Sequence, residues 1–337
     1  MICSFFLGAN TPEGFYSLFG ELKGFDLHVI KGSCGSGKST LLKTVIDKTR
    51  CGGICERILC ASDTSSLDGA VFHPINAAAV DGTPPHTAET SNMGRYIVMP
   101  SPASGIENHR GEIAALKEAK SGAYTRAYAC LKGAAYARSS ARALVKFDSG
   151  KLARRADGIL EREARPGSDM GRLHRRFIDA FTPDGFVTLR DTVDALANRI
   201  YVIEDNLSQA SPLLHALQKG LLERGYDVYG CLDPMAPENT RHILVPQLRL
   251  AFVTSDGLSR FEGDVYRRLH MTAYTDQASL KSCRAKIRLF DKLQTALLEQ
   301  AYEELKTARL SHIELEKLHL PYLDIPALKK LNENISL

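Results

Sequence analysis

A glycine-rich loop, set between a short apolar segment and a helical segment, is the feature that most constrains the fold of this chain. Its residues fit the Walker A pattern G-x-x-x-x-G-K-[ST] and are Gly32, Ser33, Cys34, Gly35, Ser36, Gly37, Lys38, Ser39 and Thr40. Residues 25–30 before the loop are apolar enough for a buried strand, and residues 40–48 after it carry apolar side chains at helical spacing. The sequence therefore predicts a strand, a phosphate-binding loop and a helix in succession.

The loop predicts a specific chemistry. Glycines let backbone amides close around phosphate oxygens, and the helix N-terminus adds a favourable dipole. We expect Lys38 to reach the β- and γ-phosphates and the hydroxyl of Ser39 to bind Mg²⁺. The predicted cofactors are therefore ATP and Mg²⁺.

Acidic residues further along the chain are candidates for the rest of this site. Within the segment 75–83, small apolar residues lead up to Asp81, as in a Walker B strand that ends in a carboxylate. Asp81 is therefore the preferred second Mg²⁺ ligand. Asp63, at the end of a strand expected over 57–63, is the alternative, and residues 64–69 are expected to form a turn. Asp63, Asp68 and His86 are candidates to orient an attacking water, although His86 also fits an ordinary loop histidine.

The chain contains an internal repeat. Thr11-Pro12-Glu13-Gly14, which combines turn and helix-start residues, returns as Thr182-Pro183-Asp184-Gly185, an offset of 182 − 11 = 171. Segments on both sides of the glycine loop return in the same order at offsets of 173 and 172, namely Val29-Ile30 as Val202-Ile203 and Leu41-Leu42 as Leu213-Leu214. This order indicates duplication of one α/β unit.

The second copy lacks the loop's chemistry. Residues 204–211 contain no glycine and no lysine, and they are one residue shorter than the first loop. Glu204 and Asp205 stand where phosphates would lie, and like charge there should repel a nucleotide. We expect a degenerate second unit, with a strand over 250–256 that parallels the Asp81 strand.

The rest of the chain is expected to be largely helical. Residues 108–146 predict long helices, and the apolar stripe within 281–318 predicts a helix that packs against the body of the protein rather than a coiled-coil partner. His312 and Glu316 lie one turn apart on that helix, which is more typical of a surface pair than of a metal site. The expected domains are an N-terminal unit (1–105), a basic helical insert (106–170), the degenerate second unit (171–260) and a C-terminal helical region (261–337).

Composition limits the partners. The 337 residues carry a net charge of +4, too small to argue for nucleic acid by itself. The basic stretch 151–176 keeps nucleic acid as a weak alternative to a solvated helix face. No apolar run approaches the roughly 18 residues of a membrane span, and the N-terminus has no basic segment of a signal peptide. We therefore expect a cytoplasmic protein with no membrane partner.

The cysteines predict no structural zinc site. In a cytoplasmic protein they are reduced thiols by default. The spacing of Cys51, Cys55 and Cys60 is unlike that of a zinc ribbon. Cys34 is expected simply to fill its loop position, the alternative being an oxidisable thiol whose pKa is lowered by the helix N-terminus.

Taken together, these pieces resemble a family of bacterial P-loop proteins found mainly in spore-forming Firmicutes and catalogued as ATPases or nucleotide kinases. The stretches that carry the resemblance are 6–15, 31–40, 62–63 with 66–69, 80–86 and 308–316. The resemblance implies a P-loop fold, nucleotide binding and Mg²⁺ use. Both halves often carry a phosphate loop in that family, so the degenerate second loop here is a departure.

The sequence thus predicts a duplicated P-loop α/β fold and an ATPase with one working site, which uses Lys38, Asp81, Asp63 and His86. The first alternative is a kinase that transfers the γ-phosphate to a nucleotide or small-molecule acceptor. The second is a non-catalytic, nucleotide-gated scaffold or nucleic-acid binder.

Overall fold

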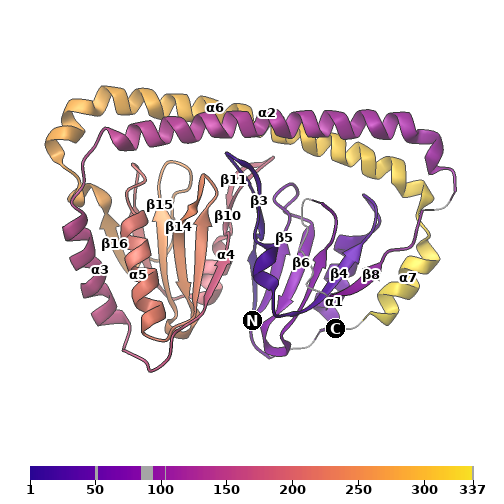
Figure 1. The fold of residues 1–337 in the computed structure, drawn as a ribbon, viewed down its shortest axis with the longest axis horizontal. Coiled ribbons are helices and arrows are strands. Elements are labelled where there is room, and N and C mark those ends of the chain that lie inside the picture. Colours follow the sequence, from indigo (N-terminus) through magenta and orange to yellow (C-terminus); the bar gives the residue numbers. More distant parts are fainter. Residues whose placement is uncertain (50–51, 85–93, 103, 336–337) are drawn as a thin grey trace.

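The computed structural model describes residues 1–49, 52–84, 94–102 and 104–335. Cys51 and the candidate His86 lie outside these residues. The chain is an α/β protein with two mixed six-stranded sheets in two similar halves, which lie side by side beneath a pair of long helices (Figure 1). The predicted α/β class and the predicted duplication are confirmed.

The first half is a sheet with one central helix. In spatial order its strands are β1 Ile2–Phe5, β5 Cys55–Leu59, β6 Leu67–Phe72, β7 Ala77–Asp81, β4 Asp26–Lys31 and β8 Arg95–Val98. The strands β1 and β5 are parallel, as are β7, β4 and β8, whereas β6 runs antiparallel to both of its neighbours. Helix α1 (Lys38–Lys48) packs its buried residues Leu41, Leu42 and Val45 on this sheet.

The second half repeats this arrangement. Its strands, in the same spatial order, are β9 Leu173–Arg176, β13 Val228–Asp233, β14 Ala236–Val245, β15 Leu250–Ser255, β12 Arg199–Glu204 and β16 Arg267–His270. Helix α5 (Ser211–Glu223) takes the place of α1, and α4 (Arg190–Leu196) corresponds to the single 3-10 turn at Phe19–Leu22.

The repeat extends to unusual backbone geometry. A 3-10 turn precedes the β7 strand and another precedes the β15 strand, and each ends in a residue with left-handed φ, Asn76 at 49° and Arg249 at 50°. Ile30 pairs with Asp81 across β4 and β7, and Ile203 pairs with Thr254 across β12 and β15. This common register aligns the two halves at an offset of 173 and makes Asp205 the counterpart of Gly32.

Two sequence expectations in the first sheet were wrong. The strand expected over 57–63 ends at Leu59, so Asp63 lies in the turn that follows β5. The turn expected over 64–69 ends before Leu67, where β6 begins as a central strand with every residue buried. A strand buried on both faces shows no alternation of polar and apolar residues, so periodicity does not reveal it.

The Thr-Pro-acid-Gly motifs form hairpin turns, not helix starts. They join β2 (Gly8–Thr11) to β3 (Gly14–Ser17), and β10 (Asp179–Thr182) to β11 (Gly185–Thr188). Each threonine hydroxyl donates to the glycine carbonyl three residues on, at 2.7 and 2.9 Å. The glycines have φ of 108° and 104°, a region that other residues rarely adopt, so hairpins replace the expected helix starts.

An approximate two-fold axis relates the two halves at their interface. Phe6 donates its amide to the Phe177 carbonyl at 2.8 Å, and Phe177 returns the bond at 3.0 Å. The inner faces of both sheets and the two hairpins contribute to a single shared apolar core. Glu56 and Arg176 form a buried ion pair between the halves, with Nε–Oε2 at 2.7 Å.

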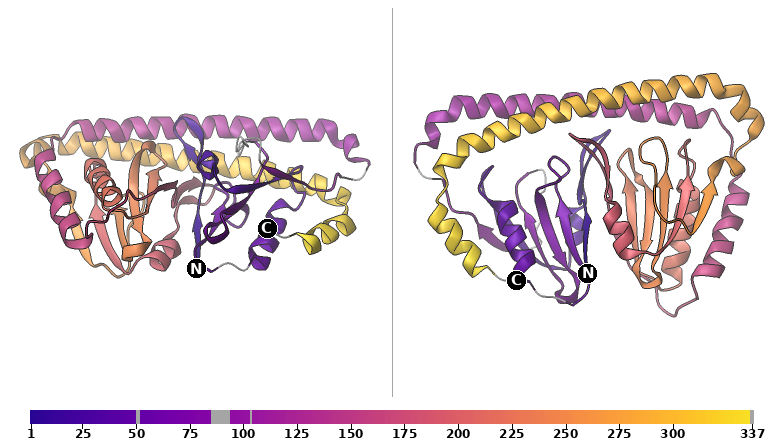
Figure 2. Two further views of the ribbon diagram at one scale, coloured as in Figure 1. Left: turned by 60° about the horizontal axis from the view of Figure 1, so that its bottom comes forward. Right: turned by 180° about the vertical axis from the view of Figure 1, so that it is seen from behind.

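Each long helix connects one half to a shorter helix that packs on the other half. Helix α2 (Arg110–Ala143), about 50 Å long at 1.5 Å per residue, leaves the first half and leads to α3 (Ser149–Glu163), which packs on α5 of the second half. Helix α6 (Gln277–His319) returns from the second half and leads to α7 (Ile325–Asn334), which packs beside α1 (Figures 1 and 2). Each half is therefore completed by a helix that follows the other half's sheet.

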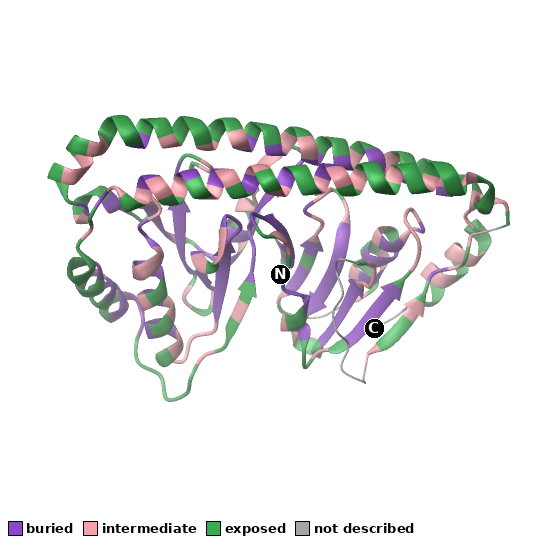
Figure 3. Cartoon of the chain, turned by 45° about the horizontal axis from the view of Figure 1, so that its top comes forward, coloured by how far each residue is buried: buried purple, intermediate pink, exposed green. Residues whose placement is uncertain are grey.

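The long helices bury a narrow face. On α2 the buried positions are mostly alanines, and its Tyr124, Tyr128, Leu131 and Ala135 lie on the face that the sequence predicts. The apolar stripe of α6 packs on α2 and on the second half, as expected, while the outer faces of both helices are exposed (Figure 3). Within the described residues, no helix is both long and apolar enough to cross a membrane.

Candidate functional site

The glycine loop lies between the end of β4 and the start of α1, the order of strand, loop and helix that the sequence predicts. Gly35 and Gly37 have φ of 68° and 87°, which side chains other than glycine rarely adopt. A Cβ on Gly32 would lie 2.5 Å from the Oγ of Ser36 and 2.7 Å from Met99. Three glycines are thus required, two by backbone angle and one by close contact.

Lys38 turns back over this loop. Its side chain is almost buried, and its ammonium donates to the carbonyl oxygens of Gly32 at 3.2 Å and Ser33 at 2.8 Å. The same ammonium lies 3.8 Å from Oδ2 of Asp81. The structure therefore brings together two residues that are far apart in the sequence and that the sequence assigns to one site.

Ser39 and Asp81 lie at the same edge of the sheet. The hydroxyl oxygen of Ser39 accepts the Leu67 amide at 2.9 Å, and Oδ1 of Asp81 accepts the Thr83 amide at 2.8 Å. Asp81 is the last residue of β7, as predicted, and β7 is parallel to and directly beside β4. Ligands of open α/β sheets bind at this carboxyl edge.

The remaining predicted acids are already engaged. Asp63 accepts hydrogen bonds from Ser65 and Ser66, and Arg309 donates to it at 3.4 Å. Burial alone would raise the pKa of Asp63, but these hydrogen bonds and the Arg309 charge hold it below its usual value. Asp68 is buried at the start of β6, where it contacts the Cys60 thiol.

Helices α2 and α6 add residues that sequence reasoning did not assign to the site. Helix α6 crosses the loop so closely that a Cβ on Gly35 would lie 3.4 Å from the Glu316 Cα. His312 contacts Cys34 from α6, and Lys120 approaches His312 from α2, with Nζ–Nδ1 at 3.0 Å. The i, i+4 spacing of His312 and Glu316 is a visible signal, but nothing in the sequence places the pair over a loop some 280 residues earlier.

The alternative expectation for Cys34, a thiol of lowered pKa, was wrong. Burial, followed by the negative charge of Glu316, raises the pKa of this thiol to about 11. Lys120 and Lys38 act in the opposite direction but do not compensate. The thiol is therefore protonated at neutral pH.

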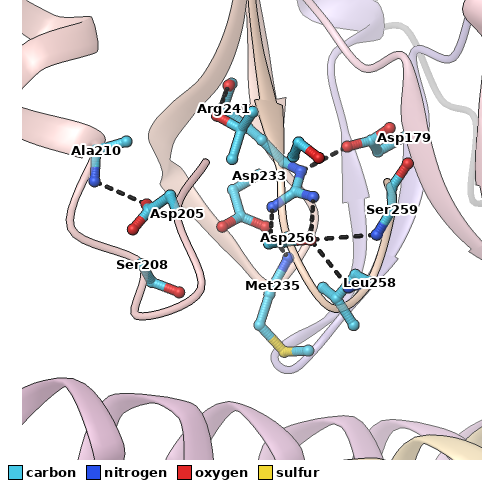
Figure 4. A network of polar contacts seen from close by, with 12 residues as sticks. Asp179, Asp205, Ser208, Ala210, Asp233, Met235, Arg241, Asp256, Leu258 and Ser259 are labelled. Carbon is cyan, nitrogen blue, oxygen red and sulfur yellow. Dashed lines mark hydrogen bonds and ion pairs between the residues drawn. The ribbon is translucent and has the colours of Figure 1, made fainter. Parts of the chain in front are cut away.

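The second-half loop is closed by its own carboxylate. Asp205, the counterpart of Gly32, is buried and accepts the amides of Gln209 at 2.7 Å and Ala210 at 2.8 Å (Figure 4). After the one-residue deletion these two amides correspond to those of Gly37 and Lys38, for which the described residues provide no hydrogen-bond acceptor. The second loop thus supplies its own carboxylate acceptor to two amides whose counterparts in the first loop have none among the described residues.

Beside this loop the second half buries a dense ionic network. Arg241 bonds Asp256 through both terminal nitrogens, at 2.7 and 2.9 Å, and Asp179 through Nε at 2.6 Å (Figure 4). His242 accepts the Thr254 amide at Nδ1, so its Nε2–H donates to Asp179 at 2.7 Å. Because its hydrogen bonds are mutually satisfied, this network is structural.

Part of the basic stretch 151–176 is paired within the protein. Arg176 is buried against Glu56, and Arg175 pairs with Glu21 at 2.5 Å. Arg162 bonds Glu163 and Tyr201. Several of its charges are therefore neutralised within the protein.

We compared the chain with protein-family models, with curated proteins and with solved structures, and none of the three comparisons found a match.

Proposed function

We propose that the Gly32–Thr40 loop binds the phosphates of Mg·ATP and that the protein hydrolyses it. The observation that carries this proposal is the contrast between equivalent amides. In the second half Asp205 bonds the amides of Gln209 and Ala210, while the part of the chain that the structure describes offers no such acceptor to the amides of Gly37 and Lys38. A scaffold that accommodates a carboxylate oxygen in one half is suited to a phosphate oxygen in the other.

Unpartnered polar groups in the loop support an anionic ligand. The buried hydroxyl oxygens of Ser33 and Ser36 have no hydrogen-bond partner among the described residues. Buried polar groups normally have one, and an exception needs an explanation. A phosphate oxygen would accept from such hydroxyls, and Lys38 would exchange its two carbonyl contacts for phosphate oxygens.

The residues at the sheet edge suit Mg²⁺. Ser39 offers a hydroxyl and Asp81 a carboxylate, both hard oxygen ligands, and each has a lone pair besides the one that accepts a backbone amide. The ion supplies charge neutralisation to the transferring phosphoryl group when it is bound. Ser39 and Asp81 hold it next to the Lys38 ammonium.

Positive charge for the reaction comes from the covering helices. Lys120 lies on α2 near the loop, and Arg309 lies on α6, where it joins Asp63 to Asp184. Charge directed at a transferring phosphoryl group is a large catalytic contribution. With its pKa held low, Asp63 stays ionised and can accept a hydrogen bond from an attacking water or from an acceptor hydroxyl, so it serves hydrolysis and the kinase alternative equally.

The test is ADP production from Mg·ATP by the purified chain. Lys38→Ala is expected to lower turnover by about a hundredfold or more, whereas Lys43→Ala, an exposed lysine on the same helix, leaves it unchanged. The assay is repeated with a panel of nucleosides and nucleotides. Turnover that requires one member of the panel would replace hydrolysis by phosphoryl transfer, and ATP binding without turnover would leave the scaffold alternative.

A further inference from the structure

Three metal-binding side chains meet where α6 crosses the glycine loop. The Sγ of Cys34 lies 3.6 Å from Nδ1 and 3.8 Å from Nε2 of His312. Nε2 of His312 lies 3.6 Å from Oε1 of Glu316. One ligand atom from each of the three residues lies within 4.8 Å of the other two.

The spacing fits a tetrahedral metal ion. With Zn–S near 2.3 Å and Zn–N or Zn–O near 2.0–2.1 Å, two tetrahedral ligands lie roughly 3.3–3.6 Å apart. Around Nε2 of His312 the observed separations, 3.8 Å to Sγ of Cys34 and 3.6 Å to Oε1 of Glu316, differ from this by a few tenths of an ångström. The Cys34 and Glu316 ligand atoms lie within 4.8 Å of each other, and rotation of the two side chains would bring them together around an ion. His312 and Glu316 are fixed one turn apart on a helix, and the backbone beside Cys34 touches that helix at Glu316.

The three side chains are a thiol, an imidazole and a carboxylate that an ion can reach from solvent. Cys34 and His312 are partly buried and Glu316 is exposed. Imidazole nitrogen, sulfur and carboxylate oxygen are the three kinds of protein ligand that zinc takes.

We propose that Cys34, His312 and Glu316 bind a zinc-class divalent metal ion that fastens α6 to the glycine loop. A thiolate, an imidazole and a carboxylate together select zinc or cobalt over magnesium. The Cys34 thiol releases its proton to solvent as the sulfur–metal bond forms, and no electron is transferred. Three protein ligands leave a fourth position for water.

Lys120 is the group that opposes the ion. Its ammonium lies 3.0 Å from Nδ1 of His312 and must swing away, which its long side chain on the partly exposed α2 surface allows. Removal of this charge is therefore expected to strengthen binding. If Cys34 only packed against His312 and no ion were bound, removal of the Lys120 charge would produce no such increase in metal affinity.

The test is a titration of the purified, nucleotide-free chain with Co²⁺, followed by competition with Zn²⁺. Cobalt bound to a thiolate gives a sulfur-to-metal charge-transfer band. The expected result is a band that saturates at one ion per chain and that zinc abolishes. Cys34→Ser is expected to remove the band, while Cys130→Ser, at another partly buried cysteine, retains it.

Further variants separate this site from its surroundings. Loss of a ligand in Glu316→Gln is expected to weaken the affinity roughly 10–100-fold, and Lys120→Met is expected to raise it. The absence of a band, or a band that persists in Cys34→Ser, would overturn the proposal. Lys38→Ala should retain the band, so failure of nucleotide binding and failure of metal binding are distinguishable.

Discussion

The two halves of this protein place different groups at the same point of the same scaffold. The first half has Gly32 at this point and Lys38 at the start of α1, and the described residues offer no acceptor to the amides of Gly37 and Lys38. The second half has Asp205 at the position of Gly32 and Ala210 at that of Lys38, and its carboxylate bonds the corresponding amides. Under the proposed function, the second loop lost its ligand site by supplying the anion itself, with no change in fold.

The two halves also carry different side chains at one equivalent position of β6 and β14. Gly69 pairs with Val80, and His242 pairs with Val253, so Asp68 in the first sheet corresponds to Arg241 in the second. Arg241 is fully engaged by two buried carboxylates. We infer that this ionic network of the second half contributes to stability, whereas at the same position of the first half Asp68 is held by its contact with the Cys60 thiol.

The strongest way to break this comparison is Arg241→Met. Its loss leaves Asp179 and Asp256 buried without their cation, which is expected to lower the free energy of unfolding by about 3–5 kcal/mol. The measurement is urea unfolding. Arg95→Ala, which removes an exposed pair with Asp26, is the control and should cost less than about 1 kcal/mol. Similar losses in the two variants would contradict a structural role for the network.

The interface between the halves predicts an acid-dependent loss of stability. Burial alone would raise the pKa of Glu56, but Arg176 and His73 lower it from its ordinary value near 4.5 to about 2. Because the ionised form is favoured by folding, its contribution is complete above about pH 4.5 and is lost as pH falls through about 2, roughly 3 kcal/mol in all.

The measurement is the free energy of unfolding against pH for wild type and Glu56→Gln. The wild type should lose stability relative to the variant as pH falls below about 4.5. A difference between the two that stays constant with pH would show that this carboxyl does not titrate as the buried ion pair requires.

A smaller effect is expected from Gly32→Ala in the first loop. The new Cβ would approach the Ser36 hydroxyl and Met99 too closely, at an expected cost of about 1–3 kcal/mol in stability together with weaker nucleotide binding. Gly20→Ala is the control, since its Cβ would have no neighbour within 4 Å. Equal urea midpoints for the two variants would mean that the loop adjusts without cost.

The smallest predicted effect comes from a substitution in the loop of the second half. Asp205→Ala removes the acceptor of two backbone amides and is expected to destabilise the second half by about 1–2 kcal/mol. Thermal or urea unfolding beside Asp194→Ala, an exposed acid on α4, provides the measurement. A variant more stable than wild type would show that burial of this carboxylate costs more than its hydrogen bonds return.

Local patterns in the sequence were enough for the loop, α1, the Asp81 strand and the repeat. Each of these rests on residues close together in the chain, such as glycines required by left-handed φ at Gly35 and Gly37. The strand β6 was missed because all its residues are buried, and the hairpins were misread because Thr-Pro-acid-Gly suits both a turn and a helix start.

The covering helices could not be placed from sequence. An amphipathic stripe predicts that α6 packs on something, but not that it returns to the first half and carries His312 and Glu316 over Cys34. Likewise, nothing local indicates that α3 completes the second half and α7 the first. These contacts depend on the duplicated architecture as a whole, which joins segments hundreds of residues apart.

The central claim is that one loop is open to a phosphate and its counterpart is filled. Calorimetric titration of the purified chain with Mg²⁺ and a non-hydrolysable ATP analogue tests it most directly. The account predicts one nucleotide per chain in the wild type, loss of binding in Lys38→Ala and unchanged binding in Lys43→Ala. Two nucleotides per chain, none, or one that persists in Lys38→Ala would contradict it.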